Sequence, residues 1–204
     1  MLPTTWRLAR IAAITCLWIG AVSGGCKPRD KSEASEAGAK HDARRAAGKS
    51  LDVDVPADFL EHKAPDGTIS VKAPPPWTDT GDLTGHTVLS LEDETGMTFS
   101  VLALDRVSVS ARDPKVFADG MVERTLRNHR NFSHVRTEYF RVAGVDSARM
   151  VFENDGNETR RRTIQVVIPA EPHTYVVTYS CALDRYDRFA MTFDQMLASL
   201  KIAD

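Results

Sequence analysis

The sequence has 204 residues, enough for one domain of ordinary size with extensions. Charged residues make up 26% and hydrophobic residues 42%, which is typical of a globular protein with a real core. The charge is uneven, because residues 27–50 carry seven Lys or Arg against four Asp or Glu, whereas residues 51–204 carry seventeen against twenty-four. An acidic domain argues against nucleic acid as a main partner, since phosphate binding needs clustered cations.

The first 25 residues have the layout of a secretory signal peptide. Arg7 and Arg10 form a short positive region, and an apolar run of about twelve residues follows over 11–22. A helix needs roughly 20 apolar residues to cross a membrane, so this run is too short. The small residues at 23–25 suit a peptidase, which needs an unbulky substrate. The pattern predicts that residues 1–25 are removed.

Gly24, Gly25 and Cys26 resemble the lipobox of bacterial lipoproteins, in which a cysteine directly follows small residues. Ser23 stands where that motif usually has a bulky aliphatic residue. The resemblance implies a diacylglycerol on the Cys26 thiol and cleavage after Gly25. Each buried methylene contributes about 0.8 kcal/mol, so two or three acyl chains would hold the protein at a membrane.

The expected location is therefore a bacterial cell envelope, with the membrane reached through acylated Cys26. Lys27 is not the aspartate of inner-membrane retention, which favours the outer membrane over the inner one. Two alternatives stay open. Cleavage at a site such as Ala21-Val22-Ser23 would give a secreted soluble binding protein, and an uncleaved apolar run would give an N-terminal anchor.

Residues 26–50 are expected to form a disordered tether. From residue 27 onward this segment has no bulky hydrophobic side chain, so it cannot bury enough apolar surface to offset the entropy of ordering. A flexible coil of that length spans roughly 25–30 Å on average. The tether would lift a domain clear of the lipid headgroups.

The folded domain is expected over 51–204, where the hydrophobic pattern changes. Residues 56–63 (PADFLEHK) are predicted to form one or two helical turns, because proline suits a helix start. Residues 64–68 (APDGT) form a turn. The alternation of Ile69 and Val71 predicts an edge strand, which ends at the stiff corner 74–77 (PPPW).

A hairpin and a long helix come next. The hairpin joins strands over 87–92 and 97–107 through the turn 93–96. The helix begins with Asp113 as the N-cap and Pro114 in the first helical position, and it should end near residue 131.

Four strands and a closing helix complete the domain. The strands are expected over 134–142, 145–153, 159–168 and 174–181. The last of them is apolar or hydroxylated throughout, which suits a central position covered on both faces. The closing helix has Asp184 as its cap and an apolar stripe at helical spacing. The fold class is α+β, a mainly antiparallel sheet of about seven strands with helices packed on it.

Residues at both ends of this domain are similar to those of the PsbP-like superfamily, which includes DcrB-type bacterial lipoproteins. They are Pro65-Asp66-Gly67, Ile69-Ser70-Val71, Pro76-Trp77, Tyr175 to Tyr179 and Phe193 to Leu200. The resemblance covers about residues 52–203 and implies a PsbP-like α/β/α sandwich. It also implies an accessory or binding role rather than an enzymatic one, because no catalytic set of the family exists to carry over.

Cys181 is the one residue of the domain that suggests covalent chemistry. It lies just before the last helix, and a histidine together with Asp184 would complete a nucleophilic site. The simpler interpretation is a core residue, because Cys181 shares a strand face with Tyr175, Val177 and Tyr179. A cryptic enzyme or thiol-redox protein is thus the alternative to a binding protein.

The other polar motifs have simpler interpretations. The five histidines of the domain, at 62, 86, 129, 134 and 173, lack the spacing of a metal site. The acidic stretch 153–158 (ENDGNE) is a hairpin turn without the spacing of a calcium loop. Arg160, Arg161 and Arg162 begin a strand, and alternation sends the middle one to the opposite face, as a partner-binding patch or as solvated charge.

The sequence therefore predicts a lipid-anchored cell-envelope protein with a non-catalytic binding or accessory domain. Its partner would be a protein or a small ligand of unknown identity. No catalytic, cofactor-binding or metal-binding residue is predicted.

Overall fold

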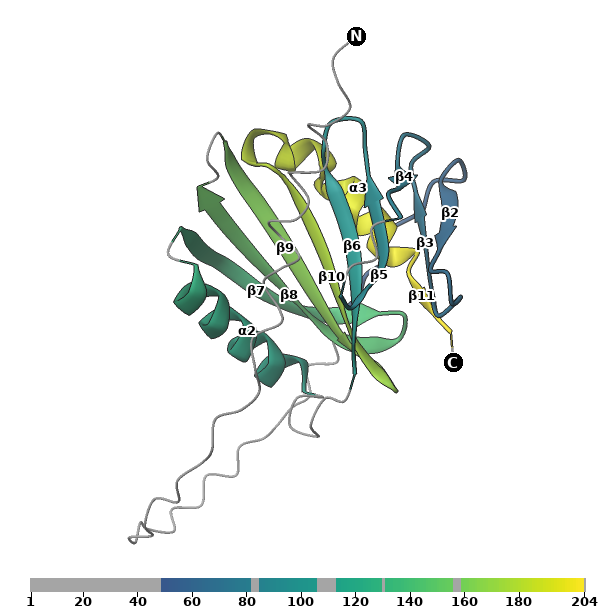
Figure 1. The fold of residues 1–204 in the computed structure, drawn as a ribbon. Coiled ribbons are helices and arrows are strands. Elements are labelled where there is room, and N and C mark those ends of the chain that lie inside the picture. The colour runs from purple at the N-terminus through teal and green to yellow at the C-terminus, as the bar shows by residue number, and fades with distance from the viewer. Residues whose placement is uncertain (1–48, 82–84, 106–112, 130, 156–158, 204) are drawn as a thin grey trace, which may run out of the picture. The chain divides into compact units, whose positions relative to one another are not determined.

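A computed structural model of the chain describes residues 49–81, 85–105, 113–129, 131–155 and 159–203. Figure 1 shows a large sheet, a small sheet and two long helices. Within the described ranges, no helix combines the length and the apolar character that a membrane crossing requires.

The main sheet has eight strands in the order β1-β7-β8-β9-β10-β6-β5-β4. In chain order they are β1 (Lys49–Ser50), β4 (Thr78–Asp79), β5 (Thr87–Glu92), β6 (Thr98–Asp105), β7 (Phe132–Val142), β8 (Val145–Asp155), β9 (Arg160–Pro169) and β10 (His173–Ala182). All pairings are antiparallel except that of β1 with β7. The α+β fold class with a mainly antiparallel sheet is confirmed. The tether was predicted over residues 26–50, but its last two residues, Lys49 and Ser50, form β1 and belong to the main sheet.

The strand predicted to be central does lie inside the main sheet. β10 pairs with β9 on one side and with β6 on the other, and every residue from Thr174 to Cys181 is buried. Burial on both faces explains why all side chains of this stretch are small, apolar or hydroxylated.

A second sheet of three strands, in the order β11-β3-β2, corrects two predictions. Its strands are β2 (Leu60–Lys63), β3 (Ile69–Ala73) and β11 (Lys201–Ile202). The helical turns predicted over 56–63 are wrong, because residues 60–63 are a strand that pairs antiparallel with β3. The edge position predicted for the strand at 69–73 is also wrong, because β11 covers its other side.

The turn between β2 and β3 is as predicted. Gly67 has φ +74°, a conformation that side-chain-bearing residues rarely adopt. The carboxylate of Asp66 accepts hydrogen bonds from the Thr68 backbone N–H at 3.0 Å and from its hydroxyl at 2.7 Å. These contacts fix the reversal that brings the two strands together.

Two long helices flank the main sheet. α2 (Pro114–Asn128) begins as predicted, since the Asp113 side chain accepts a hydrogen bond from the Lys115 N–H at 2.8 Å. α3 (Tyr186–Ala198) follows a short 3₁₀ helix, η3 (Leu183–Arg185). Asp184 lies inside η3, and the N-cap of α3 is Arg185 without a side-chain bond. The capping role predicted for Asp184 is therefore wrong.

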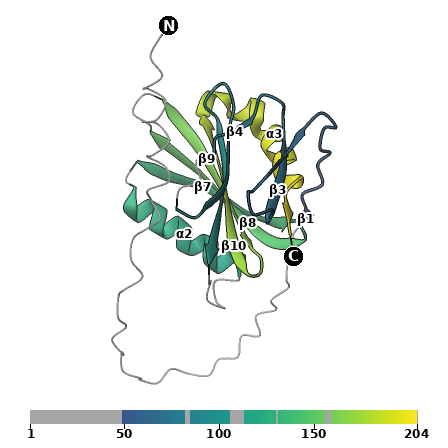
Figure 2. The same ribbon diagram turned by 45° about the vertical axis from the view of Figure 1, so that its right-hand side comes forward.

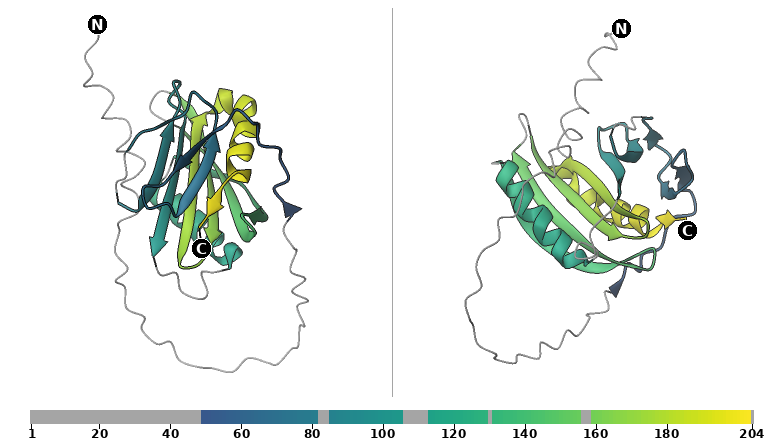
Figure 3. Two further views of the ribbon diagram at one scale, coloured as in Figure 1. Left: turned by 90° about the vertical axis from the view of Figure 1, so that its right-hand side faces the viewer. Right: turned by 60° about the horizontal axis from the view of Figure 1, so that its bottom comes forward.

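The helices lie on opposite faces of the main sheet, and the right-hand view of Figure 3 shows this layering. α2 covers β7, β8 and β9, whereas α3 packs against β10 and against β3 of the small sheet. Figure 2 shows β3 beside α3. The core between the main sheet and α3 holds fully buried side chains from both. Tyr179 of β10 and Phe193 of α3 are examples, and the centroids of their stacked rings lie 4.6 Å apart.

Candidate functional site

Several residues that carried functional predictions lie outside the described ranges. They are the lipidation residue Cys26, the cleavage position Gly25, and residues 156–158 of the acidic turn. The anchor therefore stays a prediction. The remaining candidates, which are Cys181, the histidines and the arginine triplet, all belong to the described domain.

Cys181 is a core residue. Its exposed fraction is 0%, and it shares the core with Tyr179 and Tyr186. Burial raises the pKa of the thiol, and the charge of Asp184 raises it as well, so the two groups do not form an activated pair. A protonated, enclosed thiol cannot act as a nucleophile in this conformation.

The histidines of the described domain are separated and make local contacts. His134 Nε2 lies 2.9 Å from the Thr137 hydroxyl, and His173 Nδ1 lies 2.8 Å from Asp105 Oδ1. The His129 ring packs against Phe132 with centroids 5.3 Å apart. In the described part of the chain, no three His, Cys, Asp or Glu side chains gather closely enough to hold a metal ion.

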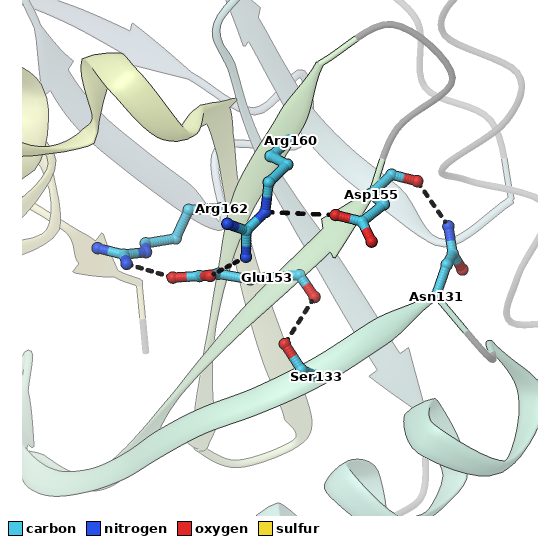
Figure 4. Close-up of polar contacts among 6 residues, drawn as sticks. All are labelled: Asn131, Ser133, Glu153, Asp155, Arg160 and Arg162. Atoms are coloured by element: carbon cyan, nitrogen blue, oxygen red, sulfur yellow. Dashed lines mark hydrogen bonds and ion pairs between the residues drawn. The ribbon is translucent and has the colours of Figure 1, made fainter.

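The arginine triplet is divided between the two faces of β9, as alternation predicted. Arg161 Nε donates to the Ser180 hydroxyl at 3.2 Å on one face. On the other face, Arg160 and Arg162 both donate to the Glu153 carboxylate (Figure 4). The triplet is thus not one basic patch.

Glu153 is the central residue of a group of charged side chains that includes Arg160, Arg162 and Asp155. Arg160 Nη2 lies 3.0 Å from Glu153 Oε2, and its Nε lies 3.3 Å from Asp155 Oδ1. Ser133 of β7 and Asn131, which directly precedes β7, donate to the backbone carbonyls of the two acidic residues. The Ser133 hydroxyl donates to the Glu153 carbonyl at 3.4 Å, and Asn131 Nδ2 donates to the Asp155 carbonyl at 3.0 Å (Figure 4).

The charges continue across the sheet through Tyr186 at the start of α3. The guanidinium of Arg162 lies over the Tyr186 ring, 4.2 Å from its centroid. Tyr186 also interacts with Arg136. Burial lowers the pKa of Arg136, but Glu138 and Tyr186 outweigh that effect and the pKa is raised overall. Arg136 Nε donates to Glu138 Oε1 at 2.9 Å.

The chain of contacts ends on α3. Glu138 Oε2 lies 3.5 Å from Arg149 Nη1, and Arg149 Nη2 donates to Asp194 Oδ1 at 2.5 Å. We call the connected set the charged row. It consists of Arg136, Glu138, Arg149, Glu153, Arg160, Arg162 and Asp194, with Tyr186 between its two halves.

Strand alternation brings the charged row to one face. Glu138 pairs with Arg149 in the β7–β8 register, and Glu153 pairs with Arg162 in the β8–β9 register. Residues directly opposite each other in antiparallel strands share a face, so opposite charges meet. Tyr186 and Asp194 reach the same face from α3, where eight residues are little more than two turns.

Arg149 is the most enclosed member of the charged row. Only 9% of the residue is exposed, and its guanidinium lies over the ring of Phe140 at 4.8 Å and over that of Phe193 at 5.8 Å. Burial raises the pKa of Asp194, and the charge of Arg149 opposes that shift. An arginine is stable at this enclosed position because its long side chain packs against the two aromatic rings while its charge is paired with Asp194.

The charged row is suited to recognition rather than to proton transfer. Each carboxylate of Glu138, Glu153 and Asp194 has an arginine partner, and arginine does not give up its proton near neutral pH. Its outer members are accessible, since 60% of the Arg160 side chain and 42% of the Glu138 side chain are exposed. Sequence reasoning missed this site. The available signal was a lone arginine, Arg149, inside the apolar strand SARMVF.

Comparison with known proteins identifies the fold. No family model matches the sequence, and no curated protein matches it. The chain is similar to cyanobacterial PsbP (CyanoP) from Synechocystis, at 12% identity and a TM-score of 0.56 over 72% of this chain and 94% of that one. It is similar to LpqN, which is involved in cell envelope biogenesis of Mycobacterium tuberculosis, at 13% identity and a TM-score of 0.52 over 71% and 90%.

A eukaryotic structure shows the same likeness. The Ran-binding protein Mog1p of Saccharomyces cerevisiae matches at 12% identity and a TM-score of 0.50, over 72% of this chain and 96% of that one. Identities this low show a shared fold and no shared function. The described domain has the fold of the PsbP-like proteins.

Proposed function

We propose that this chain is a lipid-anchored protein of a bacterial cell envelope whose PsbP-like domain binds a partner and catalyses no reaction. The charged row carries the binding role, because it presents accessible ion pairs that can exchange partners. The enclosed thiol of Cys181 supports the absence of catalysis. Two proteins of similar fold have roles in keeping with this proposal, since Mog1p is a Ran-binding protein and LpqN is involved in cell envelope biogenesis.

The anchor rests on the boundary at Cys26. An apolar run too short to cross a membrane ends in two glycines, and the cysteine follows directly. Two or three acyl chains on that sulfur would retain the domain, because one chain alone gives only marginal membrane binding.

Replacing Cys26 with serine is expected to release the protein from the membrane. After cell fractionation, Cys26→Ser should move from the membrane pellet to the soluble or culture fraction, because position 26 then has no sulfur to be acylated. Cys16→Ser is the matched control, since Cys16 lies in the apolar run that is removed, and it should pellet like the wild type. Mass spectrometry should find an acylated N-terminal peptide that begins at Cys26. A serine variant that pellets normally would contradict the anchor.

The binding role is tested by reversing one exposed charge of the charged row. Arg160→Glu removes one of the two arginine partners of Glu153 and the arginine partner of Asp155, and it places three acidic side chains together. A protein captured by the tagged full chain from its own membranes should be lost from this variant by at least about tenfold. Arg127→Glu is the control, because Arg127 is also exposed and ion-paired but lies on α2. Equal capture by both variants would exclude the charged row as the binding surface.

A further inference from the structure

Among the described residues, few pair with the outer edge of β7. Within the described ranges, β1 is the only strand on this edge, and it covers only Phe140 and Arg141 of an eleven-residue strand. An open edge presents backbone N–H and C=O groups that can pair with another chain. β7 lies on the side of the main sheet away from β5 and β4 (Figure 1).

The backbone direction along this edge follows from β1. The Leu51 N–H donates to the Arg141 carbonyl at 3.4 Å, so the backbone groups of Arg141 point outward. The N–H and C=O of one strand residue point to the same side, and the side alternates along the strand. Tyr139 and Thr137 therefore also present their backbone groups to the open edge.

The side chains of this stretch are exposed and mutually complementary. Arg136 and Glu138 have 44% and 42% of their side chains exposed. Val135 and Tyr139 are 43% and 44% exposed, and both belong to the small set of exposed large hydrophobic residues in the described domain. The β7–β8 register shifts between His134 and Arg136, which places Val135 at a bulge.

We propose that residues 135–139 of β7 pair antiparallel with the same residues of a second copy of this chain, about a two-fold axis at Thr137. This register places Arg136 opposite Glu138 of the partner subunit, and the two-fold axis repeats the same pair on its other side. It also places Val135 opposite Tyr139 of the partner subunit. Two ion pairs and two apolar pairs would then flank a central pair of hydrogen-bonded threonines.

The charges of Arg136 and Glu138 select the position of the two-fold axis along β7. An axis at Arg136 would set that arginine against its own copy, and an axis at Glu138 would do the same with two carboxylates. Like charges directly opposite each other are destabilising. An axis at Tyr139 would extend the pairing to Arg141, which β1 already covers. The stretch Val-Arg-Thr-Glu-Tyr is therefore complementary to itself in one register, which favours a second copy as the occupant.

Disulfide formation at the axis tests the proposal in the full chain. Opposite residues of a hydrogen-bonded antiparallel pair have Cα atoms about 5.5 Å apart, within the range that a disulfide spans. Thr137→Cys in native membranes, treated with copper phenanthroline as the oxidant, should give a band of twice the chain mass on a non-reducing gel. The wild type should give none, which checks the natural cysteines.

Ser133→Cys is the matched control. Ser133 lies on the same strand and is exposed, but four residues from the axis it would be about 27 Å from its copy. The dimer yield should be at least about tenfold higher for Thr137→Cys than for Ser133→Cys. Equal yields would indicate random collision and would overturn the proposal. No dimer band, or a band of another mass, would also overturn it, because a segment upstream of β1 or another protein would then cover the edge.

A charge variant tests the register independently. In the Thr137→Cys background, Arg136→Glu sets two glutamates against each other on both sides of the axis and should lower the dimer yield about fivefold or more. Arg127→Glu in the same background changes the net charge equally but lies on α2, and it should leave the yield unchanged. A yield that is insensitive to Arg136→Glu would contradict the proposed register.

Discussion

Replacing Arg149 with alanine is expected to lower the free energy of unfolding by about 3–5 kcal/mol, the range found when one partner of a buried ion pair is removed. Only 10% of the Arg149 side chain is exposed, and its loss leaves Asp194 of α3 without its ion-pair partner. Packing is lost as well, because the guanidinium lies against the rings of Phe140 and Phe193. Urea unfolding of the full chain in detergent would measure the change.

Two controls separate the buried charge from other effects. Arg127→Ala removes an arginine from an exposed pair on α2 and should cost at most about 1 kcal/mol. Adding Asp194→Asn to Arg149→Ala should recover part of the loss, because the uncompensated carboxylate is gone. If Arg149→Ala costs no more than Arg127→Ala, the buried pair of Arg149 and Asp194 contributes no more to stability than an exposed pair does.

The loss in Arg149→Ala should also depend on pH. Burial already raises the pKa of Asp194 in the folded protein, and removing the opposing charge of Arg149 raises it further. A carboxyl group with a raised folded-state pKa binds its proton more readily in the folded than in the unfolded chain. Folding stability therefore increases as the pH falls through the folded-state pKa. The deficit of the variant should be largest at neutral pH and should shrink in mild acid.

Cys181 is expected to react with a maleimide at least about a thousandfold more slowly in the native protein than in the unfolded chain. The thiol is fully buried, so labelling requires an opening reaction, and core openings cost several kcal/mol. Peptide mapping by mass spectrometry would follow Cys181 separately from the other cysteines. The same chain in urea gives the reference rate. Fast native labelling with a lowered thiol pKa would instead support a thiol enzyme.

The elements that the sequence predicts correctly have local causes. Asp113 and Pro114 define the start of α2 without reference to any other part of the chain. The apolar stripe of α3 and the two-residue periodicity of β3 and β5 depend only on which face is buried. The α+β fold class follows from the order of these elements, which also resembles that of the PsbP-like proteins.

The errors concern residues whose conformation is set by distant partners. Residues 60–63 are extended because they pair with β3, and β11 has only two residues, too few for a periodic pattern. Asp184 lies within a short 3₁₀ helix that precedes α3. The charged row joins Arg149 to Asp194, 45 residues later, and no spacing rule connects the two. Such contacts follow from the tertiary fold, so a lone arginine in an apolar strand signals a buried charge but does not identify its partner.

The small sheet joins the two ends of the domain. The Lys72 N–H donates to the Ser199 hydroxyl at 2.8 Å across 127 residues, and β11 pairs with β3. β3 therefore lacks its second neighbour until residues 199–202 have left the ribosome. Contacts between such distant residues delay folding. The small sheet would thus be among the last parts of the domain to form as the chain is synthesised.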